Sequence, residues 1–112
     1  MFELRLDEDI FNVVKDGTKC VECRLYDEKR REIKVGEQLD FIKRPLMEDR
    51  INTKVIGLKV YSNFDELVND YDMSELYLPE FSKEDFLVLL ERFYSKEEQE
   101  KYGVVAIRFE VI

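Results

Sequence analysis

Histidine is absent from the 112-residue chain, and cysteine occurs only at Cys20 and Cys23. A structural zinc site takes four ligands, so this C-x-x-C pair lacks the partners that such a site needs. The pair also lies in a segment with a strand pattern. Because strand positions three apart face opposite sides, the two thiols would point away from each other, which argues against a redox pair. We therefore expect two reduced cysteines, no metal site and no cofactor.

Long apolar runs are also missing. No stretch approaches the ~20 apolar residues of a membrane span, and the first residues lack the basic and apolar segments of a signal peptide. The length fits one domain, residues 1–112, and the 45% hydrophobic and 39% charged fractions are typical of a globular protein. These features predict a cytoplasmic protein with no membrane partner.

Positive charge is scarce and unevenly placed. The net charge of −8 argues against a protein that binds nucleic acid over its whole surface. Residues 1–60 carry 13 basic and 13 acidic side chains, whereas residues 61–112 carry 5 and 13. The basic side chains between positions 24 and 34 form either a local basic edge or an ordinary solvated loop with interspersed acidic residues.

Apolar and polar residues alternate in several segments, which is the pattern of half-buried strands. Gly57 interrupts the longest of these segments and indicates a bulge or a bend. The predicted strands are residues 2–6, 19–26, 38–43, 50–61 and 104–112.

Helices are predicted where capping residues precede apolar residues at helical spacing. One starts after Asp7 and ends at Gly17, and a single helical turn is expected at residues 27–31. Later helices start at Asn63, extending to about Tyr71, and at Ser82 and Ser95, while residues 73–79 are expected to be irregular. Five strands and three or four helices predict an α+β fold whose last strand pairs with the first and closes a small barrel.

The segment Gly17–Arg24 is the strongest candidate for a site, because it reads G-x-K-x-x-E-x-R where a plain strand would be apolar or neutral. Residues i and i+2 of a strand share a face, so Glu22 and Arg24 point the same way, with Cys20 and Tyr26 beside them. The guanidinium would lower the pKa of Glu22. Lys19 has the opposite parity and joins this cluster only if the turn at Gly17 twists the strand entry.

Three features in sequence order resemble the ASCH family of small domains with a PUA-like β-barrel. The first is the hallmark formed by Gly17, Lys19, Glu22 and Arg24. The second is the turn and strand from Ile33 to Phe41, in which Glu37 replaces the more usual Asp, and the third is the closing segment 102–107. The resemblance covers nearly the whole chain and implies a PUA-like barrel with helices packed on it.

The resemblance implies binding of RNA or a small nucleoside or nucleotide in a cleft lined by the hallmark. The predicted ligand-binding residues are Gly17, Lys19, Glu22, Arg24, Tyr26 and Arg30. Tyr26 is included as an open tyrosine that can stack on a base, and Arg30 as a member of the basic segment.

An enzymatic alternative comes from a subgroup of the family that hydrolyses N4-acetylcytidine. Such an amidohydrolase uses the hallmark Lys, matched by Lys19, a Thr three residues later, and a Glu from the helical region. The Thr position is Glu22 here, and the helical Glu is either Glu75 or Glu80. If the chain is an enzyme, Lys19 and Glu22 are the predicted catalytic residues.

Two other interpretations remain open. The charges of the hallmark also fit a surface ladder of ion pairs at a strand edge. A regulatory domain that binds another protein has no distinguishing sequence pattern here.

Overall fold

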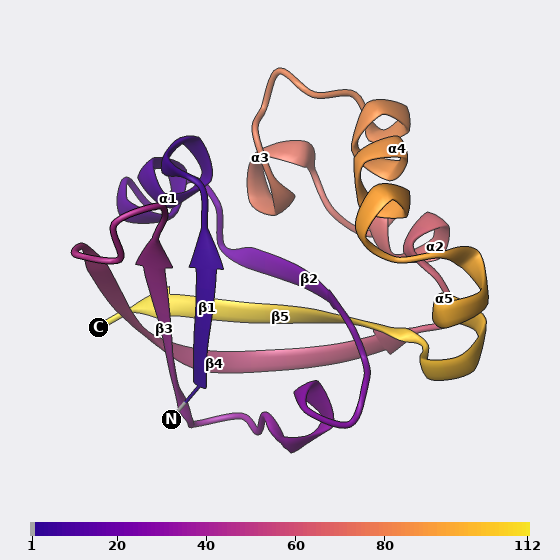
Figure 1. The fold of residues 1–112 in the computed structure, drawn as a ribbon, viewed down its shortest axis with the longest axis horizontal. Coiled ribbons are helices and arrows are strands. Elements are labelled where there is room, and N and C mark those ends of the chain that lie inside the picture. The colour runs from indigo at the N-terminus through magenta and orange to yellow at the C-terminus, as the bar shows by residue number, and fades with distance from the viewer. Residues whose placement is uncertain (1) are drawn as a thin grey trace.

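The centre of the molecule is one curved sheet (Figure 1); the computed structural model describes residues 2–112. Within those residues the sheet has five strands in the spatial order β1-β3-β4-β5-β2 and curls into a half-barrel. The strands are β1 (Phe2–Leu6), β2 (Val21–Leu25), β3 (Gln38–Lys43), β4 (Arg50–Tyr61) and β5 (Val104–Val111). Each lies within two residues of its predicted range, so the α+β class is confirmed.

The partners of β5 differ from the expectation. β5 belongs to the sheet, but it pairs with β4 and β2, while β1 pairs in parallel with β3. The pairing of the last strand with the first was therefore wrong. Alternation of apolar and polar residues shows which face of a strand is buried but does not identify its neighbour. The predicted irregularity in β4 is confirmed by a register shift between Val55 and Gly57.

Five α-helices occur within residues 2–112, one more than the upper expectation. They are α1 (Glu8–Lys15), α2 (Phe64–Val68), α3 (Met73–Leu76), α4 (Lys83–Phe93) and α5 (Lys96–Tyr102). The side chains of Asn63, Ser82 and Ser95 cap the helices that follow them, as predicted. A short 3-10 helix, Arg30–Glu32, lies close to the turn expected at residues 27–31.

The unexpected helix is α3, in the stretch expected to be irregular. The backbone N–H of Asp72 donates to Glu75 Oε1 at 3.1 Å, which satisfies a donor at the start of this single turn. The helix starting at Asn63 is correspondingly shorter than predicted and ends at Val68. Because α3 has only four residues, its stability comes from tertiary contacts rather than from its own sequence.

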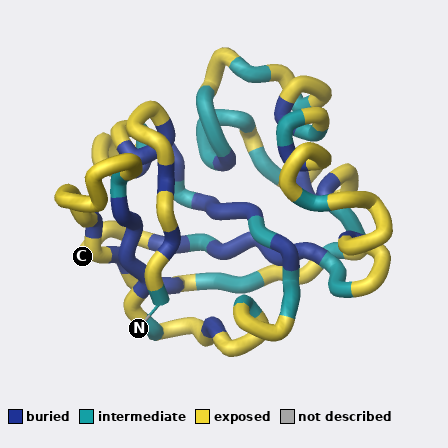
Figure 2. Tube along the Cα trace, viewed as in Figure 1, coloured by how far each residue is buried: buried dark blue, intermediate teal, exposed yellow. Residues whose placement is uncertain are grey.

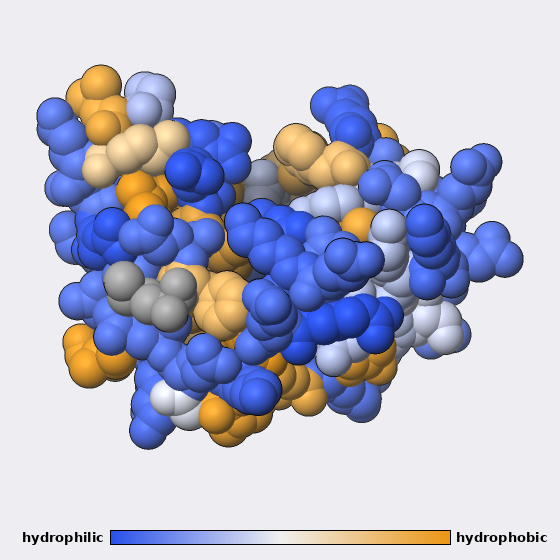
Figure 3. Space-filling model, turned by 60° about the horizontal axis from the view of Figure 1, so that its bottom comes forward, coloured by the Kyte–Doolittle hydropathy of each residue, from blue (hydrophilic) through white to orange (hydrophobic). Residues whose placement is uncertain are grey.

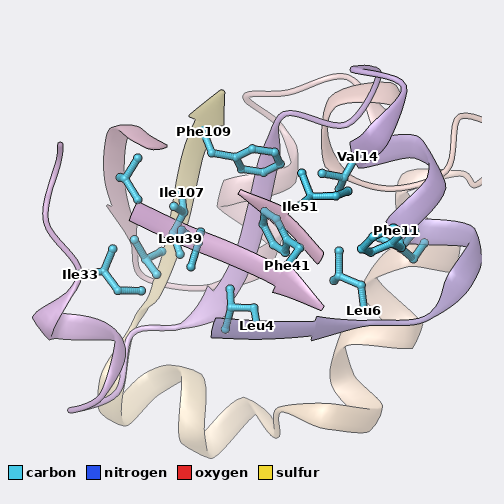
Figure 4. Packing of buried hydrophobic residues seen from close by; sticks show 13 residues of the cluster. Leu4, Leu6, Phe11, Val14, Ile33, Leu39, Phe41, Ile51, Ile107 and Phe109 are labelled. Carbon is cyan, nitrogen blue, oxygen red and sulfur yellow. The ribbon is translucent and has the colours of Figure 1, made fainter. Parts of the chain in front are cut away.

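Buried positions are frequent along the strands of the sheet (Figure 2). The buried apolar residues of the described chain form two clusters. The first lies between the curved sheet and α1, and Phe41 and Phe109 pack there with ring centres 4.8 Å apart (Figure 4). The second joins β2 and β5 to α2, α3 and α4. β5 serves both clusters, since Val105 and Ile107 belong to the first and Val104 and Ala106 to the second. β5 is therefore the strand that links the two clusters.

The face of the molecule drawn in Figure 3 is mostly hydrophilic, with separate apolar patches rather than one continuous area. None of the helices described in residues 2–112 has the length and apolar character needed to cross a membrane.

Candidate functional site

The hallmark segment begins at the turn that ends α1. Gly17 has φ +88°, the left-handed conformation predicted for the end of this helix. The backbone N–H of Thr18 donates to Asp16 Oδ1 at 2.9 Å, and that of Lys19 donates to the carbonyl of Val13 at 3.0 Å. The turn therefore folds back onto α1 before β2 begins at Val21.

This turn carries Lys19 into the interior, where its exposed fraction is 1%. Its Nζ lies 3.0 Å from Glu22 Oε1 and donates to the carbonyls of Val21 at 2.7 Å and Leu76 at 2.5 Å. An ammonium group has three donors, so these contacts use all of them. Lys19 precedes the strand, which is why strand parity does not apply to it and it joins the cluster.

Glu22 and Arg24 share a face of β2, as predicted. Glu22 Oε2 accepts from Arg24 Nε at 3.1 Å and from Arg24 Nη2 at 2.9 Å. Glu22 Oε1 is the oxygen paired with Lys19, and it also accepts from the backbone N–H of Cys23 at 3.3 Å. The carboxylate is thus held between two cations that approach opposite oxygens.

Burial and the neighbouring charges shift the pKa values of Glu22 and Arg24 in opposite directions. Burial alone raises the pKa of Glu22, but the charges of Lys19 and then Arg24 outweigh it and hold the pKa at about 2. Burial alone lowers the pKa of Arg24, yet Glu22 and Tyr94 raise it above its usual value. Glu22 and Arg24 are therefore both charged at neutral pH, in an environment where an unpaired charge is costly.

A cleft with a volume of about 200 Å³ lies above Glu22 and Arg24. Its walls come from the end of β1, the start of α1 and the residue after β3 on one side, and from α3 and α4 on the other (Figure 1). The charged side chains in the lining are Arg5, Asp7, Glu22, Arg24 and Arg44. The aromatic side chains in the lining are Tyr77, Phe86, Phe93 and Tyr94.

The cleft does not include every predicted site residue. Lys19 lies beneath the floor rather than in the lining, and Gly17 is exposed in the turn. Tyr26 packs under the guanidinium of Arg31, 4.3 Å from ring centre to Cζ. Arg30 Nη1 donates to Asp27 Oδ2 at 2.7 Å. Tyr26 and Arg30 follow the end of β2 at Leu25, where the chain has left the floor of the cleft.

Neither candidate helical glutamate lines the cleft. Glu75 uses Oε1 to accept from Asp72 and Oε2 to pair with Arg108 Nη2 at 3.2 Å. Glu80 is exposed in the connection between α3 and α4. Arg108 Nη1 also lies 3.5 Å from Cys20 Sγ, so Cys20 and Glu75 form a separate cluster with Arg108.

Several cleft residues have no local sequence signal. Arg5 alternates with Leu4 and Leu6 as any outward residue of a strand would, and Arg44 lies in the polar connection after β3. Phe93 sits at a helical position typical of core residues, yet 68% of its surface is exposed. Only the packing of α4 across from β1 brings these residues to one cleft.

A larger hollow of about 520 Å³ is lined by residues of α2 and α5 and of the loops beside them. Its polar groups serve the fold: Asn63 caps α2, and Gln99 Oε1 accepts from the backbone N–H of Phe64 at 3.0 Å. In the part of the chain that the structure describes, no group of three or more Cys, Asp or Glu side chains is placed to hold a metal ion. The smaller cleft, with its buried charges, is the better candidate site.

Comparisons with known proteins give the family. The model of the ASCH domain matches residues 4–112. The crystal structure of the hypothetical protein PH0355 superposes with a TM-score of 0.83 at 38% identity, covering 99% of this chain and 98% of that one. The solution structure of protein PF0455 from Pyrococcus furiosus gives 0.76 at 34% identity, covering 99% and 96%. A comparison with curated proteins gave no match. The chain therefore belongs to the ASCH domain family.

Proposed function

We propose that this ASCH domain is a binding module for RNA or a nucleotide, and that the ligand enters the cleft above Glu22 and Arg24. The observation that carries the proposal is the placement of Arg24. Glu22 holds its guanidinium through Nε and Nη2 on the floor of the cleft. A guanidinium fixed in this way is oriented before the ligand arrives, which suits recognition of phosphate or a base carbonyl.

The charge around the cleft supports an anionic ligand. Among the described residues of the lining, Arg5, Arg24 and Arg44 face only two carboxylates, Asp7 and Glu22. The charge of Glu22 is further offset by Lys19 from below. This local excess of positive charge occurs in a chain with a net charge of −8, so binding is confined to the cleft and weakens steeply as salt rises.

The opposite wall supports a flat, apolar group beside the phosphate. Phe93 and Leu89 come from α4, and Tyr77 follows α3. Bases stack on aromatic side chains with little dependence on sequence. A cleft with a cationic side and an aromatic side therefore matches the two chemical parts of a nucleotide.

Binding of a short fluorescent single-stranded RNA, measured by anisotropy at low salt, tests this proposal. Phe93→Ala and Arg24→Lys are expected to weaken binding about tenfold, because they remove a stacking surface and the oriented guanidinium. Arg30→Ala is the control, since Arg30 lies outside the cleft lining. A loss in Arg30→Ala as large as in Phe93→Ala would move the ligand to the basic segment and contradict the cleft. Absence of RNA and nucleotide binding at low salt would reject the function.

A second candidate function is hydrolysis of N4-acetylcytidine. The observation that favours it is the contact of Lys19 with Glu22 at 3.0 Å. Against it, Lys19 is 1% exposed and its three donors are already used. Incubation with N4-acetylcytidine and chromatography of the products separates the two functions. We expect no release of cytidine above buffer, whereas turnover that Lys19→Arg abolishes would establish the enzyme.

A further inference from the structure

We infer that Arg5 and Arg44 form a phosphate-binding subsite at the edge of the cleft, and that the cleft takes the phosphorylated end of a single strand. The inference rests on the proposed function and specifies its ligand. It concerns residues outside the hallmark, at the ends of β1 and β3. The ligand has one base against α4 and one terminal phosphate monoester against the two arginines.

The backbone fixes the position of the arginines. β1 and β3 pair in parallel up to Leu6 and Lys43, so Arg44 leaves the sheet beside the end of β1. The backbone N–H of Arg44 donates to the carbonyl of Leu6 at 2.8 Å. Its side chain then turns back, and Nη2 donates to the carbonyl of Arg5 at 3.2 Å. This contact uses one donor of a guanidinium that has five, which leaves most of its donors for a ligand.

The electrostatic balance at this edge favours a dianion. The nearest carboxylate to Arg44 is Asp7, with 3.8 Å between Nη1 and Oδ1, and 78% of the Asp7 side chain is exposed. Such an open pair is weak and can yield to a phosphate. A phosphate monoester carries close to two negative charges at neutral pH, whereas an internal phosphodiester carries one. Two arginines therefore discriminate in favour of a strand end.

The small volume of the cleft suits a single nucleotide. Its volume of about 200 Å³ lies below the usual range of small-molecule pockets, roughly 300–1,000 Å³. The apolar side, with Leu89 and Phe93, accommodates one base, and Phe93 is open enough to be stacked upon. The cationic side serves one phosphate. An internal nucleotide is joined to a neighbour on both sides, whereas a terminal nucleotide is joined on one side only. Only a terminal nucleotide can therefore place a phosphate monoester beside the two arginines while its base lies against α4.

The test compares strands that differ only at one end. Short single-stranded RNAs of one sequence are prepared with a phosphate or a hydroxyl at the 5′ end, and likewise at the 3′ end, with the dye at the other end. A nucleoside, its monophosphates and inorganic phosphate are added as competitors. We expect one phosphorylated end to bind about tenfold more tightly than its hydroxyl counterpart. The matching monophosphate should compete better than the nucleoside or inorganic phosphate.

Charge variants assign the effect to the arginines. Arg5→Gln and Arg44→Gln should each remove most of the preference for the phosphorylated end, and Asp7→Asn should increase it. Lys54→Gln is the matched control, because Lys54 is exposed on β4 and lies outside the cleft lining. Circular dichroism confirms that each variant is folded before its affinity is compared.

The outcomes separate this inference from the proposed function. Equal binding of phosphorylated and hydroxyl ends, with a loss in Phe93→Ala, overturns the phosphate subsite and leaves the binding module standing. A preference for the phosphorylated end that Lys54→Gln reduces as much as Arg44→Gln also overturns the subsite, because it shows a general charge effect. Inorganic phosphate competing as well as the monophosphate overturns the one-nucleotide ligand. No binding of any strand rejects the proposed function itself.

Discussion

The ammonium group of Lys19 and the main-chain carbonyl of Leu76 meet at 2.5 Å, although 57 residues separate them in the sequence. This hydrogen bond joins the hallmark segment to α3, the single-turn helix on the other side of the cleft. The backbone N–H of Cys20 adds a second link, to the carbonyl of Glu75 at 3.0 Å. The hallmark segment therefore holds α3, which forms part of one wall of the cleft, through two hydrogen bonds to its main-chain carbonyls.

Removal of the Lys19 charge should destabilise the protein strongly. Lys19→Met leaves Glu22 buried with one cation fewer and leaves the Leu76 carbonyl without its donor, which we expect to cost about 3–5 kcal/mol of the free energy of unfolding. Urea denaturation measures this value. Lys15→Met is the matched control, since Lys15 is exposed at the end of α1, and it should change stability by less than about 0.5 kcal/mol. Similar losses in both variants would contradict the role given to Lys19.

Glu22 should make stability depend on acid pH. Its folded-state pKa of about 2 lies below the usual value of 4.5 for a glutamate side chain, so its contribution to stability is fully present above about pH 4.5. That contribution is lost as the pH falls from about 4.5 to about 2, by about 3 kcal/mol in total.

Two measurements check this prediction. Titration of the Glu22 side-chain carboxyl by NMR in the wild-type protein should give an apparent pKa near 2, and a value near 4.5 would contradict the buried pair. In Glu22→Gln the fall of stability between about pH 4.5 and 2 should be smaller than in the wild type. If Glu22→Gln does not fold, the NMR titration alone decides.

Arg108 should protect the backbone amide of Cys20 from hydrogen exchange, because Arg108 holds Glu75, whose carbonyl accepts from that amide. Its guanidinium lies 3.2 Å from Glu75 Oε2, but it is partly exposed, so Arg108→Met should cost only about 0.2–1 kcal/mol of stability. The expected effect is local: the Cys20 amide, which donates to Glu75, should exchange its hydrogen faster. Arg108→Lys should restore part of the protection. Unchanged exchange at Cys20 in Arg108→Met would contradict this coupling.

The two cysteines should react differently. Burial raises the pKa of Cys23 to about 12, and the residue packs in the second core cluster, whereas Cys20 is half-buried. Alkylation of the native protein should therefore modify Cys20 first, because the thiolate is the reactive form. Mass spectrometry identifies the site, and Cys20→Ser should show almost no labelling until denaturant is added. Rapid labelling of native Cys20→Ser would contradict the burial of Cys23.

Local patterns were sufficient for most of the secondary structure. Alternation placed all five strands within two residues, and Asn63, Ser82 and Ser95 marked three helix starts correctly. The exception was α3, whose cap at Asp72 and Glu75 stabilises a turn too short to persist without its tertiary contacts.

Local patterns also predicted part of the site and missed the rest. Spacing along the strand was enough to pair Glu22 with Arg24, because residues i and i+2 share a face whatever the rest of the fold does. The same spacing left the side of Lys19 undecided, since Lys19 lies in the turn before the strand. Tyr26 and Arg30 stay predictions that the structure places away from the cleft.

The sequence by itself therefore determined the strands, three of the helix caps and the placement of Glu22 and Arg24 on one face of a strand, all of which follow from short-range geometry. Only the tertiary structure decided that Lys19 reaches Glu22 and Leu76, that β5 lies between β4 and β2, and that Arg5, Arg44 and Phe93 share one cleft. These relationships join segments far apart in the chain, through main-chain carbonyls and packed helices. No residue pattern along the sequence encodes such contacts directly.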